Sequence, residues 1–564
     1  MKRSFLFMAV ALLSVVCLSF AAVNKPVRAT LDANGPEGAA IKAPTPSKSP
    51  GDTVGFTSLD WVHNGPMGGA IVADKLGNLH FGYTYRNAAG TAGSRTPQYN
   101  FLNASGWLGA TDVAASGRWG TVGCKPTTGV GLFAYYYTAG STYPTMLGID
   151  ADAGVGMFDI YGVDNSNPLD QLSAHPYLAV ASDDTMYLLA DGDADEFVFN
   201  YSYDGGVTWG TWVDLSQAST SFVTDFPEMN IAAKGSKVAI SSYCVDYHMM
   251  YRESDDFGAT WKDAVMVVDG LNGTALGTDS IGCYIHGVPF YDAAGNLHIV
   301  NSAFTWSADT TGAVPYFEGI VHWSEATGLN WVHKEANTAV NGGSNTLTCS
   351  WPWITQMDDG TLVVSYTHFV AEDIAANGTA NGDIWAAKST DGGANWFNQT
   401  NITNSVSNGA ADGACEDDRY PACAAVGDSI HFFWLNSKVA GTSLLGELTA
   451  MSFDPLLHYA VHKDDITGVA GLPPTRPSSR LVLNQNRPNP VSGNTAISFS
   501  LPRASDYTLK VYNVAGQVVS TISGRGQAGN NSVSWNSRDV SNGVYFYQLN
   551  AAGSTATRKM IVVK

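Results

Sequence analysis

Three eight-residue stretches share one pattern: SYDGGVTW at 202–209, SDDFGATW at 254–261 and STDGGANW at 389–396. Each has serine first, aspartate third, glycine fifth, threonine or asparagine seventh and tryptophan last. A worn copy at 324–331 has alanine in place of the aspartate. The repeated positions are Ser202, Asp204, Gly206, Trp209, Ser254, Asp256, Gly258, Trp261, Ser389, Asp391, Gly393 and Trp396. One local structure is therefore used several times in this chain.

The residue types of this pattern indicate turns. Serine and aspartate side chains accept hydrogen bonds from backbone amides in a tight hairpin, and glycine supplies the positive φ that such a turn needs. The final tryptophan is expected to pack between layers of strands. We therefore expect each copy to close a hairpin, and we assign its aspartate no catalytic role.

A second repeat sets the scale of the fold. Two weak copies lie around 69–72 and 121–123, and five clear copies consist of a residue followed by proline and a strand: His175-Pro176, Phe226-Pro227, Val288-Pro289, Trp351-Pro352 and Tyr420-Pro421. Units about 50 to 70 residues apart are typical of four-stranded propeller blades. The sequence predicts an all-β fold, a six- or seven-bladed β-propeller with seven blades favoured, over residues 56–462.

The eight-residue pattern resembles the Asp-box, or BNR repeat, of sialidases and related propellers. This resemblance covers residues 56–462 and implies a sialidase-like propeller. In that family the aspartates are structural, and a trio of arginines clamps the carboxylate of the sugar.

Residues 481–564 differ in character. Alternating runs separated by glycine-containing turns predict a small immunoglobulin-like β-sandwich after a linker at 463–480. The Asn-Arg-Pro-Asn-Pro entry from Asn486, the Gly-x-Tyr-x-Tyr strand from Gly543 and the final Lys-Met-apolar strand resemble the type IX secretion sorting domain. The resemblance implies recognition by that export machinery; an ordinary immunoglobulin-like module is the alternative.

The N-terminus predicts export as well. Lys2 and Arg3 precede an apolar run from Phe5 to Phe20, which is the layout of a secretory signal peptide at residues 1–22. A buried helix and a lipid anchor at Cys17 are the alternatives. We expect a mobile leader at 23–55, no transmembrane segment, and a secreted or outer-surface location reached through the periplasm of a Gram-negative-type bacterium.

Composition narrows the partners. The 30 basic and 50 acidic residues give a net charge of −20, and no basic cluster is available to bind phosphates, so nucleic acid is not an expected partner. An extracellular glycan or glycoprotein is expected instead. We expect no metal or cofactor, with calcium at the acidic run Asp191–Glu196 as the lesser alternative to a hairpin tip. Cys415 and Cys423 could bridge a local loop.

Residues just before the first strand of each unit should meet at one mouth of the propeller, where ligands commonly bind. Sialidases carry an arginine there, and among the five proline units only Arg419 before Tyr420 matches. The candidates for catalysis are Arg419, Asp225 and Glu228, and those for ligand binding are Arg118, His175, Trp351 and Tyr420. The alternative is that the charges are solvated and the aromatic side chains pack between blades.

Three functions stay open. The first is a propeller that binds extracellular glycans or proteins; the second is an exo-sialidase or related glycoside hydrolase; the third is a purely structural surface component. Residues 56–462 contain five arginines, so a three-arginine clamp would need most of them to converge. Wide separation of Arg118, Arg252 and Arg419 would exclude the sialidase hypothesis.

Overall fold

The chain forms two compact units, which divide between Gly471 and Leu472, inside the predicted linker. Apart from single residues, the computed structural model describes residues 40–42, 47–59, 69–87, 95–137, 144–163, 174–192, 196–217, 229–244, 247–305, 317–336, 340–343, 346–441, 450–467, 482–483, 491–501, 505–526, 529–538, 540–551 and 553–563. The predicted signal peptide lies outside these ranges. None of the helices within them is long and apolar enough to cross a membrane.

Seven sheets of four or five strands make up the described part of the first unit. The first three sheets contain β3 (Ile71–Ala73), β4 (Leu79–Arg86), β5 (Arg95–Asn103), β6 (Gly106–Trp107) and β7 (Thr111–Asp112); β8 (Arg118–Cys124), β9 (Gly131–Tyr136), β10 (Thr145–Asp150) and β11 (Phe158–Gly162); and β12 (Ala174–Val180), β13 (Met186–Asp191), β14 (Phe197–Ser202) and β15 (Val213–Asp214).

The next three sheets follow in chain order. They contain β16 (Met229–Lys234), β17 (Lys237–Cys244), β18 (His248–Ser254) and β19 (Val265–Val268); β20 (Thr274–Leu276), β21 (Asp279–Tyr291), β22 (Leu297–Thr305), β23 (Phe317–Ser324) and β24 (Gly328–Ala336); and β25 (Cys349–Gln356), β26 (Leu362–Ile374), β27 (Ala380–Ser389) and β28 (Phe397–Asn401).

The seventh sheet joins the two ends of the propeller. Its order is β29 (Asp417–Val426), β30 (Ser429–Ser437), β32 (Asp454–His462) and β2 (Asp52–Thr57), so the N-terminal strand is its outermost member. A two-stranded sheet pairs β1 (Ala40–Lys42) with β31 (Ala450–Ser452), and the short 3-10 helix η3 (Lys463–Asp465) follows β32.

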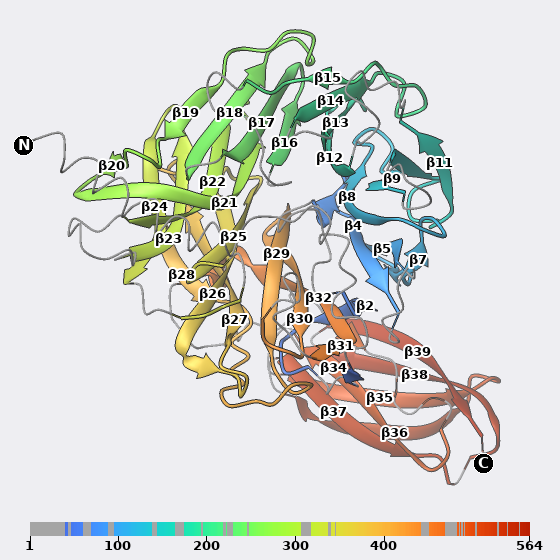
Figure 1. Cartoon of the computed structure of the whole chain (residues 1–564). Coiled ribbons are helices and arrows are strands. Elements are labelled where there is room, and N and C mark those ends of the chain that lie inside the picture. The colour runs from blue at the N-terminus through green and yellow to red at the C-terminus, as the bar shows by residue number, and fades with distance from the viewer. Residues whose placement is uncertain are drawn as a thin grey trace, which may run out of the picture. The chain divides into compact units, whose positions relative to one another are not determined.

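The seven sheets form a closed ring, the arrangement of a β-propeller (Figure 1). Contacts run from β8 to β12, β16, β21, β25 and β29 in turn, and β29 contacts β3, which contacts β8. Each sheet packs against a neighbour on both faces, so its inner strands are buried on both sides: all nine residues of β22 and all six of β9 are buried. This explains why these strands read as continuous apolar runs without strict alternation.

The folded part of the chain begins at an earlier residue than the sequence indicated. The predicted mobile leader at 23–55 is wrong at its C-terminal end, because Asp52 already pairs with His458 in β2. Upstream of β2, the Ser49 hydroxyl donates to both carboxylate oxygens of Asp418, at 3.0 and 2.8 Å. Hydrogen bonds to residues far along the chain, which sequence patterns do not reveal, fix this segment.

The C-terminal unit is a β-sandwich. Its two sheets contain β33 (Val482–Leu483), β34 (Asn494–Leu501) and β37 (Gly529–Asn536), and β36 (Val518–Gly526), β35 (Ser505–Asn513), β38 (Gly543–Ala551) and β39 (Ser554–Val562). One core holds side chains from both sheets, among them Phe499 and Trp535 from one and Val511 and Tyr547 from the other. The alternation of exposed and buried residues along β38 agrees with the predicted pattern.

Candidate functional site

The first strands of four sheets carry a β-bulge near their start. A large side chain occupies each bulge with a positive φ: 40° at Trp119, 51° at His175, 57° at Trp351 and 57° at Tyr420. The pairing register shifts at each of these points. Non-glycine residues rarely adopt positive φ. The same bulge near the start of the first strand in four sheets therefore indicates a shared local structure that sets the direction of these side chains.

The bulge at Trp119 escaped the sequence repeat because glycine replaces the proline. A Cβ at Gly120 would lie 2.1 Å from the carbonyl oxygen of Ala134, so only glycine fits there. Arg118 and Trp119 therefore occupy the positions of Arg419 and Tyr420 in the seventh sheet. The structure thus gives two sheets, not one, an arginine directly before the aromatic residue of the bulge.

All these bulges lie at one end of the propeller, which we call the mouth end. The first strand of each sheet starts there, and the antiparallel second strand returns to it, so Arg86 at the end of β4 and Arg95 at the start of β5 also lie at this end. The eight-residue repeats connect third and fourth strands and lie at the opposite end. Sheet order therefore separates the structural turns from the candidate site.

The Asp-box-like turns have the predicted hydrogen bonds. In the copy at 389–396, Ser389 Oγ donates to Asp391 Oδ1 at 2.8 Å, and the amides of Gly393 and Asn395 donate to Ser389 Oγ and Asp391 Oδ1, both at 2.9 Å. Trp396 Nε1 donates to the Gly393 carbonyl at 3.1 Å. The copies at 202–209 and 254–261 repeat these bonds. Each of the three turns is thus closed by hydrogen bonds between its side chains and its own backbone amides.

Arg419, the arginine chosen from sequence, is engaged inside the protein. It is fully buried; its Nε donates to Asp417 Oδ2 at 2.5 Å and its Nη2 donates to the Gly342 carbonyl at 2.6 Å. Its guanidinium also lies 5.6 Å from the Trp351 ring and 5.1 Å from the Phe369 ring. These contacts give Arg419 a structural role.

Trp351 and Tyr420 are packed together as well. Their ring centroids are 4.4 Å apart, and both side chains are buried in the large core cluster that lines the ring of sheets. The sequence made both residues candidates for ligand binding. In the structure, their side chains pack against each other in the core between sheets.

Three other arginines gather around the equivalent bulge. Arg118 lies 5.1 Å and Arg95 lies 5.9 Å from the Trp119 ring, and Arg86 is the direct cross-strand neighbour of Arg95. We call Arg86, Arg95 and Arg118 with Trp119 the arginine cluster. It contains three of the five arginines of the propeller region, in a chain of net charge −20.

A histidine and a tyrosine adjoin this cluster. The His175 ring stacks on Trp119 with centroids 5.1 Å apart, and the Tyr136 ring is 5.2 Å from His175 and 5.4 Å from the Arg118 guanidinium. His175 Nδ1 lies 3.7 Å from Asp191 Oδ2, at the end of β13. The structure thus joins two sequence candidates, Arg118 and His175, to groups that can move protons.

The remaining candidates do not join them. Arg252 donates to the carbonyl oxygens of Leu215 and Lys262, at 2.6 and 2.9 Å, and no contact joins it to Arg118 or Arg419 in the described ranges. The convergence of Arg118, Arg252 and Arg419 that would support a sialidase is therefore not found there, and no three-arginine clamp of these residues is assigned. Asp225 and Glu228 lie outside the described residues.

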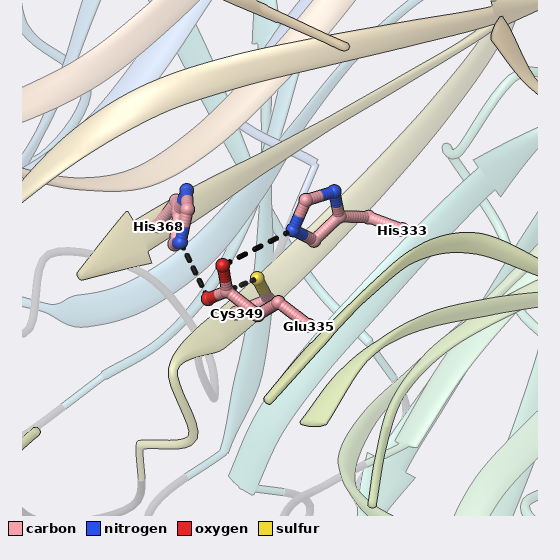
Figure 2. A group of neighbouring side chains, drawn as sticks. All are labelled: His333, Glu335, Cys349 and His368. Carbon is pink, nitrogen blue, oxygen red and sulfur yellow. Dashed lines mark hydrogen bonds and ion pairs between the residues drawn. The ribbon is translucent and has the colours of Figure 1, made fainter. Parts of the chain in front are cut away.

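A second constellation at the mouth end was missed by sequence reasoning. His333 and Glu335 on β24 meet Cys349 and His368, which face each other across β25 and β26. Their four potential ligand atoms lie within 4.8 Å of one another. We call this group the His-Glu-Cys-His cluster, and Figure 2 shows the Glu335 carboxylate between the two imidazoles.

The ionisation of this cluster follows from its contacts. Burial opposes ionisation of Glu335, but the nearby imidazole of His333, 3.6 Å away, and the hydrogen bond with His368 outweigh it and lower the pKa of the carboxyl to about 2. Burial raises the pKa of the Cys349 thiol well above its usual value, which does not suit a free nucleophile. One signal was available in the sequence: two ligand-type residues at alternate positions, His333 and Glu335, share one face of a strand.

The local disulfide that Cys415 and Cys423 could have formed is not present, because both cysteines are free. Cys423 lies in the core with its sulfur accepting from Ser365 Oγ at 3.5 Å, whereas Cys415 donates to backbone carbonyls of Ala410 and Ala411 at 3.8 Å. The two side chains belong to different clusters, so their closeness in sequence does not bring them together.

Buried acids surround Arg419 in the seventh sheet. Asp418 is fully buried and accepts hydrogen bonds from Ser49, Ser405, Trp434 and Asn436. Burial, with the nearby charge of Asp383, raises the pKa of Asp418 to about 7, and burial likewise raises that of Asp454 to about 7. The sheet that holds Arg419 thus contains several buried carboxyl groups.

The described geometry joins a propeller to a terminal sandwich, and comparison with known proteins identifies the sandwich. Residues 487–563 match the family described as the secretion system C-terminal sorting domain. The protein is therefore exported by type IX secretion and is secreted or placed at the cell surface of a Gram-negative-type bacterium. No curated protein matches the chain.

Several solved structures are similar in fold. An ulvan lyase of a polysaccharide lyase family matches with 11% identity and a TM-score of 0.45, over 74% of this chain and 96% of its own. The intramolecular trans-sialidase from Ruminococcus gnavus matches with 13% identity and a TM-score of 0.37, over 75% and 98%. The Trypanosoma rangeli sialidase matches with 12% identity and a TM-score of 0.34, over 82% and 86%. Similarity at this level carries no information about substrate.

Proposed function

We propose that this exported propeller binds an acidic extracellular glycan, free or on a glycoprotein, and that the arginine cluster recognises a carboxylate or sulfate of that glycan. The observation that carries the proposal is that Arg95 and Arg118 lie over the Trp119 ring at the mouth end, with Arg86 the cross-strand neighbour of Arg95. A guanidinium presents a planar fork of donors that matches the two oxygens of a carboxylate.

Charge and burial define the ligand further. A chain of net charge −20 repels anions in general, so a gathering of three arginines is a local exception that favours one anionic group at one place. Arg86, Arg95 and Arg118 are 2%, 4% and 6% exposed. Such enclosed groups suit a single charged substituent at the end of a glycan better than a long chain laid across a surface.

Cleavage of the bound glycan is the second candidate, and one observation favours it. Tyr136 adjoins Arg118 and His175, His175 stacks on Trp119, and Asp191 Oδ2 lies 3.7 Å from His175 Nδ1. Tyrosine and histidine can act as acid, base or nucleophile beside a clamped carboxylate, and sialidases use a tyrosine nucleophile. The sequence alternative of a glycoside hydrolase is therefore retained at Tyr136 and His175.

Binding can be tested with the purified chain on an array of neutral, carboxylated and sulfated glycans, followed by calorimetry on the best ligand. We expect binding of acidic glycans only, weakened by salt. Arg118→Met and Arg95→Met should each weaken it about ten- to a hundredfold, since each removes a charged hydrogen-bond donor. Arg252→Met, on carbonyl oxygens away from the cluster, is the matched control. Equal binding by all variants, or preference for neutral glycans, would refute the proposal.

Cleavage needs its own assay. The same glycans, with a fluorogenic sialoside, are incubated with wild type, Tyr136→Phe and His175→Gln. If wild type cleaves a glycan and both variants bind it without cleaving it, the second candidate is supported. If wild type binds the glycan without cleaving it, only the binding function remains.

A further inference from the structure

We propose that His333, Glu335, Cys349 and His368 form a zinc site that ties the fifth sheet of the propeller to the sixth. This proposal is independent of the glycan-binding function. The four residues come from three strands in two sheets: His333 and Glu335 from β24, Cys349 from β25 and His368 from β26. Without a metal, the two sheets are joined at these four residues by side-chain contacts such as the hydrogen bond between Glu335 and His368.

The distances suit a small tetrahedral ion. Zinc binds nitrogen, oxygen and sulfur at about 2.0–2.3 Å, which places ligand atoms about 3.5 Å apart in a tetrahedron. Here Glu335 Oε1 lies 2.6 Å from His368 Nε2, Glu335 Oε2 lies 3.6 Å from His333 Nε2, and all four ligand atoms lie within 4.8 Å of one another. Side-chain shifts of less than about an ångström would bring the set to zinc geometry.

Hydrogen bonding alone does not account for the cluster. A carboxylate between two histidines is satisfied as it stands, yet His333 Nε2 is buried without a hydrogen-bond partner, and it points toward Glu335 (Figure 2). Cys349 is fully buried with its sulfur 3.9 Å from Glu335 Oε1, which is a weak contact for a polar group. A cation between the four side chains would bind both His333 Nε2 and the sulfur of Cys349.

The surroundings resemble those of a structural metal site. The His333 ring stacks on Tyr366 with centroids 5.6 Å apart, and the His368 ring meets Trp385 edge-on at 5.0 Å, so aromatic walls hold both imidazoles. Two nitrogens, one thiolate and one carboxylate are a donor set that favours zinc over the hard cations calcium and magnesium. Four protein ligands would leave no open position, which indicates a structural rather than a catalytic ion.

The position gives the ion a specific consequence. Cys349 is the first residue of β25 and stands two residues before Trp351, the bulge residue at the mouth end. Because β24 is the last strand of its sheet, zinc would fasten that edge to the start of the neighbouring sheet. Loss of zinc should therefore loosen the mouth end between the fifth and sixth sheets before it unfolds the ring.

The experiment uses the full chain, stripped of metal by a strong chelator and then titrated with zinc and, separately, with cobalt. Zinc content is measured by mass spectrometry and cobalt binding by absorbance. We expect one zinc per chain and, with cobalt, a tetrahedral spectrum with a thiolate charge-transfer band. Cys349→Ser should remove that band. His333→Gln and Glu335→Gln should each lower the affinity for zinc at least tenfold.

The matched control is His431→Gln, because His431 also lies in a buried histidine pair, 2.9 Å from His458, but in no such cluster. Circular dichroism of each metal-free variant shows which of them fold, and affinities are compared only among those. Hydrogen exchange supplies a second measurement on wild type: zinc should protect the amides of β24 and β25 selectively. Absence of stoichiometric binding by folded wild type, or equal affinity in folded cluster variants and the control, would overturn the proposal.

Discussion

The second and seventh sheets of the propeller present the same motif with opposite surroundings. In both, an arginine precedes a bulge residue with positive φ, Arg118 before Trp119 and Arg419 before Tyr420. Arg419 meets Asp417, two residues earlier in the chain, and lies in a sheet that contains several buried acids. Arg118 instead lies with Arg95 over Trp119, close to Arg86. Equivalent positions in a repeat therefore do not carry equivalent functions.

The difference shows what decides the role of a motif arginine. A carboxylate two residues earlier pairs with the guanidinium of Arg419 inside the core, whereas the guanidinium of Arg118 lies with that of Arg95 over an aromatic ring, where we propose that it recognises an anion. The aromatic residue and the bulge are common to both sheets and set only the direction of the strand. Local charge, not the repeat itself, separates structure from recognition.

The largest effect should follow from Arg419→Met. It leaves Asp417 fully buried without its ion-pair partner, so the free energy of unfolding should fall by about 3–5 kcal/mol. Chemical denaturation of the purified chain measures it. Arg118→Met removes contacts with two aromatic rings and should cost about 1–2 kcal/mol. Equal losses in the two variants would contradict the comparison.

A pH effect should come next and should belong to the seventh sheet. Asp418 and Asp454 have pKa values raised to about 7 in the folded chain, whereas an unfolded aspartate titrates near 4. The folded state therefore binds protons that the unfolded state has released, and stability should fall as the pH rises from about 4 to about 7. Asp418→Asn should flatten this slope, as thermal unfolding across that range can show. A steeper slope in the variant would contradict the assignment.

The smallest effect should come from a turn remote from both bulges. Asp391→Ala removes the acceptor of bonds from Ser389 and Asn395 at the opposite end of the propeller and should lower stability by on the order of 1 kcal/mol. Thermal melting measures it, and glycan binding should be unchanged. A change in binding would mean that the two ends of the propeller are coupled.

Sequence reasoning succeeded where the physics is local. The turns at 202–209, 254–261 and 389–396 follow from side chains bonding to amides within four residues, so their role could be predicted. The propeller fold followed from the spacing of the other repeat, the proline units. The sorting domain was recognised because its strand motifs are contiguous in the chain.

It failed where distant segments meet. Nothing in the sequence near Arg419 shows that the carbonyl oxygen of Gly342 accepts from its guanidinium, and a glycine at 120 hid the equivalence of Arg118. The His-Glu-Cys-His cluster joins strands of two sheets and has no contiguous motif. In each case the deciding fact is which side chains two separate strands bring together, and spacing alone does not specify it.

The pairing of β2 with β32 has a consequence for how the protein is made. Asp52 pairs with His458, so the ring closes only after nearly the whole propeller has been synthesised, and such distant pairing makes folding slow. Until β2 pairs with it, β32 is an open edge, with unpaired amides and carbonyls that can accept a strand from another chain. The N-terminal strand is thus also a protection against self-association, and a chain cut between it and the first sheet would expose a template for aggregation.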